Sequence, residues 1–209
     1  MTDETITFYH AAPSRGSIVH WMLEEVGAPF RTELLDLSKG EQKRPEYLAV
    51  NPMGKVPAIV HRGVVITEVA AISVYLADAF PAVGLAPAIE DPQRGTYLRW
   101  ALFEPAALEP AIIDQMLERP PGRPGALGYG DFDTTMEVVA QAVTPGPYLL
   151  GEHFSAADVL IGSALRWGMM VDCVPHRSEF AAYVERLTAR PALQRAQARD
   201  EELAGRKAG

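Results

Sequence analysis

The first 80 residues alternate between short runs of β-branched and aromatic residues and segments with helical spacing of apolar positions. Ile6–His10 and Phe30–Asp36 have the composition of strands. Between them, residues 18–26 place apolar side chains three or four apart, and Gly27 follows as a stop signal. A strand–helix–strand unit of this length predicts two parallel strands joined by a right-handed crossover.

Two more strands and one helix complete this half of the chain. Val56–His61 and Val64–Thr67 are apolar runs separated by Arg62-Gly63, which is a two-residue hairpin signal. Apolar positions then recur at helical spacing over Glu68–Phe80. The element order β-α-β followed by β-β-α predicts a four-stranded mixed sheet covered by helices. We therefore expect an α/β, thioredoxin-like domain over residues 1–80.

The second half has a different pattern. Residues 81–92 hold three prolines and a glycine, which is typical of a linker. Beyond them the apolar positions follow helical spacing, and the prolines inside Gln93–Leu117 predict a kink there. We expect an all-helical domain over residues 93–209, with a charged tail that frays from Arg199.

Ser155 opens the most apolar of these predicted helices. Ser155 and Asp158 have the spacing of a capping box, with Asp in the role usually taken by Glu. The residues that follow are apolar nearly all round, which predicts a buried central helix.

Composition narrows the possible functions. The chain of 209 residues is 48% apolar and carries a net charge of −8, so nucleic acid is not an expected partner. No apolar stretch is long enough to predict a membrane span, and the N-terminus lacks a signal peptide. The single cysteine, Cys173, excludes an intramolecular disulfide, and the five histidines show no metal-ligand spacing. We expect a protein of the reducing cytoplasm that needs no metal.

The segment Asn51-Pro52-Met53-Gly54-Lys55-Val56-Pro57 has two interpretations. It could be a strand that starts after a turn, since proline at a strand start need not donate to the ladder. Alternatively, Val56–Pro57 is a cis peptide that turns the backbone N–H and C=O of Val56 outward. An extended, peptide-like ligand would then pair with Val56 as an added strand.

Thr67-Glu68-Val69 lies where the fourth predicted strand gives way to a helix. Glu68 could simply complement the helix dipole in the first turn. It could also accept a hydrogen bond from a ligand ammonium, while the free N–H of Val69 holds a ligand carboxylate. The two groups together would recognise an amino-acid zwitterion.

These two motifs at this spacing, followed by a proline-containing linker and an all-helical half, resemble the cytosolic glutathione transferases, of a bacterial serine type or an atypical class. The resemblance implies the glutathione transferase fold, with a thioredoxin-like domain followed by an all-α domain. It implies a homodimeric enzyme that conjugates the glutathione thiolate to a small hydrophobic electrophile, with glutathione as co-substrate. It also marks the Ser155–Asp158 box as a folding element.

The resemblance assigns glutathione-binding residues one by one. Lys55 and Val56 would contact the cysteinyl part, Pro57 beside them also belongs to the glutathione-binding set, and Glu68 with Val69 would hold the γ-glutamyl end. The family usually has Ser where Val69 stands, so a hydrogen bond worth about 1.5–3 kcal/mol to a charged partner is missing. Lys43 lies in the segment that often reaches the glycine carboxylate, although a solvated charge run explains it equally well.

The same resemblance places a thiol-activating hydroxyl between the first strand and first helix. Ser14 fits best, with a helix cap as its alternative role, and Ser17 is the reserve. Arg15 would add positive potential for the thiolate. Trp100, Phe103 and Glu104 could line a pocket for the second substrate, or simply belong to the core.

A non-catalytic binding or scaffold protein on the same fold is the alternative, because a fold does not determine a function. Val69 is the residue that favours this alternative.

Overall fold

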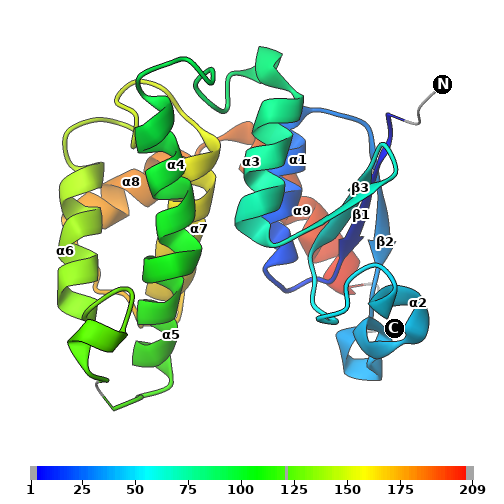
Figure 1. Cartoon of the computed structure of the whole chain (residues 1–209), viewed down its shortest axis with the longest axis horizontal. Helices are drawn as coiled ribbons and strands as arrows, with labels where there is room; N and C mark the ends of the chain where they lie inside the picture. Colours follow the sequence, from blue (N-terminus) through cyan, green and yellow to red (C-terminus); the bar gives the residue numbers. More distant parts are fainter. Residues whose placement is uncertain (1–3, 121, 206–209) are drawn as a thin grey trace. The chain divides into compact units, whose positions relative to one another are not determined.

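The computed structural model describes residues 4–120 and 122–205 and divides into two compact units (Figure 1). The first unit runs to Val83 and resumes at Arg190. The second unit spans Gly84–Ala189.

A four-stranded mixed sheet forms the centre of the first unit. Its strands are β1 (Ile6–His10), β2 (Phe30–Leu34), β3 (Ala58–His61) and β4 (Val64–Thr67), in the spatial order β2-β1-β3-β4. β1 and β2 are parallel, whereas β3 is antiparallel to both β1 and β4. The predicted thioredoxin-like arrangement is confirmed.

Two strands are shorter than predicted, each for a local reason. β2 ends at Leu34 because Asp36 caps a following 3₁₀ turn, η1 (Leu37–Lys39), by accepting a hydrogen bond from the Ser38 N–H at 3.0 Å. β3 begins at Ala58 because Pro57 has no N–H to donate to the ladder.

Helices of the first unit pack on the sheet and on one another. α1 (Gly16–Val26) packs against both α3 (Val69–Ala79) and α9 (Pro191–Gly205). The shorter η2 (Glu41–Lys43) and α2 (Pro45–Leu48) lie between β2 and β3 in the sequence, and η3 (Pro81–Val83) follows α3.

α9 corrects two expectations about the end of the chain. The prediction that the tail frays from Arg199 is wrong, because the helix continues to Gly205. The chain from Arg190 onward also belongs to the first unit, whereas the expected helical domain extended to residue 209. Ion pairs explain this docking: Arg190 and Arg195 bind Glu25 and Glu24 of α1, with shortest distances of 2.6 and 2.7 Å.

The second unit is helical throughout its regular elements, as predicted. Its helices are α4 (Arg94–Phe103), the π-helical η4 (Glu104–Leu108), α5 (Glu109–Met116), the 3₁₀ turn η5 (Pro124–Ala126), α6 (Phe132–Val143), α7 (Ala156–Met170) and α8 (Ser178–Thr188). The π-helical segment contains Pro105, so the expected interruption occurs where that proline removes a donor. In the stretch predicted as a linker, Leu85 is buried and its carbonyl accepts from the Ala156 N–H at 2.8 Å. No helix within the described ranges is long and apolar enough to cross a bilayer.

Asp158 organises the start of the buried helix α7. Its carboxylate accepts hydrogen bonds from the backbone N–H groups of Leu149 and Ser155, both at 2.8 Å, and from the Tyr183 hydroxyl at 2.8 Å. The bond from the Ser155 N–H and the reciprocal bond from the Asp158 N–H to the Ser155 side chain confirm the predicted capping box, and the Ser155 hydroxyl also donates to the carboxylate at 2.9 Å. Burial raises the pKa of Asp158, and these hydrogen bonds oppose that rise.

We predict that Asp158→Ala lowers the free energy of unfolding by about 3 kcal/mol or more, because several buried donors lose their hydrogen-bond acceptor at once. Chemical denaturation measures the loss. Asp131→Ala is the matched control, since Asp131 caps the exposed start of α6 through the Thr134 N–H at 2.8 Å. Equal losses in the two variants would contradict a special role for Asp158.

Candidate functional site

Three loops leave the sheet at one edge, and they are the loops that carry the predicted site. Tyr9 pairs with Ala58, and Ala58 pairs with Thr67, so these residues form a row across β1, β3 and β4. The β1–α1 turn, the segment before β3 and the β4–α3 turn therefore start or finish beside one another. The strand register thus brings Tyr9 close to Ala58 and Thr67, although these residues are far apart in the sequence.

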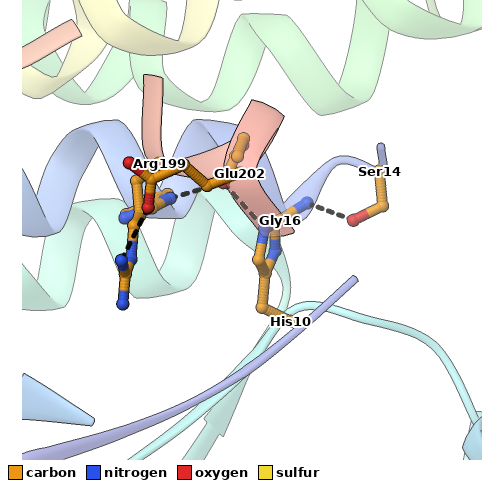
Figure 2. Close-up of polar contacts among 7 residues, drawn as sticks. His10, Ser14, Gly16, Arg199 and Glu202 are labelled. Atoms are coloured by element: carbon orange, nitrogen blue, oxygen red, sulfur yellow. Dashed lines mark hydrogen bonds and ion pairs between the residues drawn. The ribbon is translucent and has the colours of Figure 1, made fainter. Parts of the chain in front are cut away.

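Ser14 lies in the β1–α1 turn and is partly exposed. Its Oγ accepts a hydrogen bond from the Gly16 N–H at 2.9 Å, beside the ring of His10 (Figure 2). Over the part of the chain that the structure describes, no acceptor takes the hydroxyl proton. Ser14 therefore braces the turn before α1, whose N-cap residue is Arg15 rather than Ser14, and its hydroxyl still has a proton to donate.

The other two residues predicted to assist catalysis lie close by. Arg15 is exposed and immediately precedes α1. The Ser17 hydroxyl is one of the groups that lower the pKa of the Asp200 carboxyl.

The predicted cis peptide between Val56 and Pro57 is confirmed. The loop before it is pinned from inside, because the Tyr47 hydroxyl and Asn51 Nδ2 both donate to the Lys55 carbonyl, at 2.5 and 2.8 Å. Burial raises the pKa of Tyr47 to about 12, so it is a donor across the physiological range. In the described ranges, no backbone hydrogen bond engages the N–H or C=O of Val56. These two groups are available to a ligand.

Lys43 and Lys55 are both exposed at this loop. Lys43 Nζ donates to the Met53 carbonyl at 3.0 Å and so braces the turn that contains Gly54. Gly54 has a φ of 59°, a conformation that disfavours residues with a Cβ. The role of Lys43 toward a ligand carboxylate stays a prediction.

Glu68 is held in an unusual backbone conformation at the start of α3. Its φ of 67° and ψ of 122° lie outside the regions open to most L-residues, and such a residue costs about 1–3 kcal/mol. The side chain is exposed, and its carboxylate has no hydrogen bond or ion pair with any described residue. Val69 follows as the first helical residue, so its N–H has no partner within the helix. An acceptor and a donor for a zwitterion therefore stand side by side.

Trp100, Phe103 and Glu104 belong to the second unit. Trp100 is buried, contacts Phe103 edge-on at 5.3 Å between ring centroids, and carries the Arg99 guanidinium 4.4 Å above its ring. Glu104 is also buried and opens the π-helical segment η4. Their role in binding a second substrate stays a prediction.

A buried cluster at the other end of the β1–α1 turn was not predicted. His10 Nε2 and His20 Nδ1 both contact Asp200 Oδ1, at 2.9 and 2.6 Å. Burial raises the pKa of the Asp200 carboxyl, but the hydrogen bonds from His10 and His20, together with the Ser17 hydroxyl, outweigh it and hold that pKa well below its usual range.

Linear spacing could not reveal this cluster. Its histidines come from β1 and α1, and its carboxylate comes from α9, 190 positions after His10. The expectation that the histidines are scattered and unsuited to a metal rested on their spacing along the sequence alone.

Comparison with known proteins agrees with this architecture. Residues 4–78 match the family model of the glutathione S-transferase N-terminal domain. The glutathione S-transferase GstA of Escherichia coli O157:H7 is 27% identical over 178 residues, which cover 84% of this chain and 89% of that protein. The disulfide-bond oxidoreductase YfcG of Escherichia coli K12 is 28% identical, with 94% and 98% covered.

A solved structure extends the likeness to three dimensions. The glutathione S-transferase of a sphingomonad, complexed with glutathione, superposes with a TM-score of 0.78 at 26% identity, covering 93% of this chain and 98% of that one. Sequence and fold thus agree over nearly the whole length. Residues 4–78 thus match a glutathione S-transferase N-terminal domain, and the chain as a whole is similar to glutathione transferases in sequence and fold.

Proposed function

We propose that the chain is a glutathione transferase that conjugates the glutathione thiolate to a small hydrophobic electrophile. The observation that carries this proposal is the convergence, at one sheet edge, of three sets of unused polar groups. They are the Val56 backbone, the Glu68 carboxylate with the Val69 N–H, and the Ser14 hydroxyl proton.

Glutathione fits these groups from end to end. Its γ-glutamyl ammonium would lie on Glu68, and its γ-glutamyl carboxylate on the Val69 N–H and the positive end of α3. Its cysteinyl unit would pair with the N–H and C=O of Val56 as a short added strand beside Pro57 and Lys55. Lys43 would attract the glycine carboxylate. The sphingomonad relative, whose structure contains glutathione, supports this choice of ligand.

Ser14 would stabilise the thiolate by donating its hydroxyl proton to the sulfur. A free thiol has a pKa near 8.5, so only a small part is thiolate at neutral pH. The hydrogen bond from the Gly16 N–H withdraws electron density from Ser14 Oγ and makes the hydroxyl a better donor. Arg15 would add positive potential, and Ser17 is the reserve donor.

The reaction itself needs no group beyond these. The thiol proton leaves to solvent, and the sulfur lone pair forms a bond to an electrophilic carbon of the second substrate. The leaving group departs with the electrons of the broken bond. Trp100, Phe103 and Glu104 would contact this second substrate, and the active species would be a homodimer, which light scattering can test.

Two other functions compete, each with its own observation. Val69 favours a binding protein without catalysis, because it lacks the hydroxyl that strengthens glutathione binding. The relationship to YfcG favours glutathione-dependent disulfide reduction. Elution from immobilised glutathione by free glutathione establishes binding. Parallel assays with an aryl halide and with a small mixed disulfide then separate conjugation from reduction and from no catalysis.

We predict that Ser14→Ala leaves glutathione affinity nearly unchanged but raises the pKa of the bound thiol, because the thiolate loses a donor. At a pH well below the pKa of the thiol, each unit by which that pKa rises lowers the thiolate fraction about tenfold. Turnover at neutral pH falls accordingly. Ultraviolet absorbance of the thiolate follows the titration directly. Ser17→Ala is the matched control, and a larger shift in that variant would transfer the role to Ser17.

We predict that Val69→Ser tightens glutathione binding by about fivefold, since a new hydroxyl can donate to the γ-glutamyl carboxylate. Calorimetric titration measures the affinity. Val65→Ser, on the exposed strand β4, is the control for a general effect of adding a hydroxyl.

We predict that Glu68→Gln weakens glutathione binding, because the ammonium loses its anionic partner. The test is again calorimetry, with Glu46→Gln on the exposed helix α2 as control. If both Val69→Ser and Glu68→Gln bind as the unchanged protein does, glutathione does not occupy this edge, and the binding mode proposed above is incorrect.

A further inference from the structure

The His10–His20–Asp200 cluster joins three elements of the first unit, and it lies outside the groups assigned to glutathione. His10 is at the end of β1, His20 is in the middle of α1, and Asp200 is in α9. We propose that these three side chains form a binding site for one divalent transition-metal ion, with Zn²⁺ as the representative ion.

The donor atoms have the chemistry and spacing that such an ion requires. Two imidazole nitrogens and one carboxylate oxygen are ligands that Zn²⁺, Co²⁺ and Ni²⁺ prefer, whereas Mg²⁺ prefers oxygen alone. The three ligand atoms all lie within 4.8 Å of one another. Bonds of about 2.0–2.2 Å from a central ion need only small side-chain adjustments from this arrangement.

Burial and charge argue for a cation at this position. Both histidine side chains are essentially inaccessible and that of Asp200 is 14% exposed, so the carboxylate is largely removed from water. Buried charges in proteins are usually paired with an opposite charge or coordinate a metal. Among the described residues, no lysine or arginine forms an ion pair with Asp200. A metal ion would supply the missing positive charge.

The proton inventory of the cluster also permits metal binding. When the rings are neutral, the N–H groups of His10 Nε2 and His20 Nδ1 donate hydrogen bonds to Asp200 Oδ1. The opposite nitrogens, His10 Nδ1 and His20 Nε2, are buried and have no hydrogen-bond partner among the residues described. If a metal ion binds His10 Nε2 and His20 Nδ1, the proton of each ring moves to its other nitrogen, His10 Nδ1 or His20 Nε2. The neutral rings can therefore become ligands without losing a proton.

The second nitrogen of His10 has a possible acceptor nearby. A methyl group on Gly16 would lie 2.2 Å from His10 Nδ1 and 3.0 Å from Ser14 Oγ, so both atoms border the same small space (Figure 2). Hydrogen bonds from the outer nitrogen of a liganding histidine orient the ring and strengthen the site.

His20 of the cluster borders a cavity of about 720 Å³. Glu24 of α1 and Glu202 of α9 also line this cavity, each paired with an arginine of α9, Arg195 and Arg199. The identity and spacing of the donor atoms are therefore the features that support a metal site here.

The experiment uses the full chain, stripped with a chelator and dialysed. Calorimetric titration with ZnCl₂ should give one site per chain, and saturation should raise the melting temperature, since an ion that binds only the folded state stabilises it. CoCl₂ should produce visible ligand-field absorption, which reports the donor set directly. MgCl₂ is the control and should change neither measurement.

Asp200→Asn is the decisive variant. Asparagine Oδ1 can still accept from both rings, so the helix should stay docked while the anionic ligand is lost. We expect Zn²⁺ affinity to fall by more than about tenfold. Asp172→Asn is the matched control, because Asp172 forms an exposed pair with His176 at 3.5 Å.

Several results would overturn the proposal. One is unchanged Zn²⁺ affinity in Asp200→Asn, and another is a loss that appears only in Asp172→Asn. A third is a stripped protein that binds no Zn²⁺ and whose melting temperature depends on pH alone, which would assign the positive charge to a protonated imidazole. If Asp200→Asn does not fold, the cobalt spectrum and X-ray absorption of the unchanged protein decide whether nitrogen and oxygen ligands hold the ion.

Discussion

The antiparallel pairing of β3 with both of its neighbours is the constraint on which the site depends. Because Ala58 stands opposite Tyr9 on one side and Thr67 on the other, three loops must begin or end at one edge of the sheet. A register shift of one residue would turn each side chain of β3 to the opposite face and separate the loops from their packing. β3 is buried along most of its length, so the hydrophobic effect specifies this register strongly.

That edge of the sheet is polar because several of its backbone N–H and C=O groups form no hydrogen bond within the protein. Val56 makes no backbone hydrogen bond within the described ranges, and Val69 is in the first turn of α3, where N–H groups have no helical acceptor. Glu68 keeps its strained conformation only because α3 and the sheet fix both of its ends. The site therefore consists of backbone groups and one carboxylate whose positions are fixed by the surrounding structure. Few of these groups have to break a hydrogen bond within the protein before they can bind a ligand.

Local signals in the sequence predict most of the first unit and very little of its last helix. β1 and β4 have the bounds that their β-branched runs indicate, and the Ser155–Asp158 spacing identifies the capping box. The sequence motifs also identify the three loops of the sheet edge. The docking of α9 was not predictable in this way, because charged residues such as Arg199 predict exposure. Their helix is held by partners in α1 that lie more than 160 positions earlier.

Gly16 links the buried cluster to the proposed catalytic turn. Its N–H binds Ser14 Oγ, and the absence of a Cβ lets the His10 ring approach the same backbone. Asp200 in turn contacts both His10 and His20, at 2.9 and 2.6 Å, and so holds His10 in place. The conformation of the turn that presents Ser14 is thus tied to the position of α9 through a short chain of buried polar contacts. Any change at Asp200 that moves His10 must therefore act on the backbone that orients the Ser14 hydroxyl.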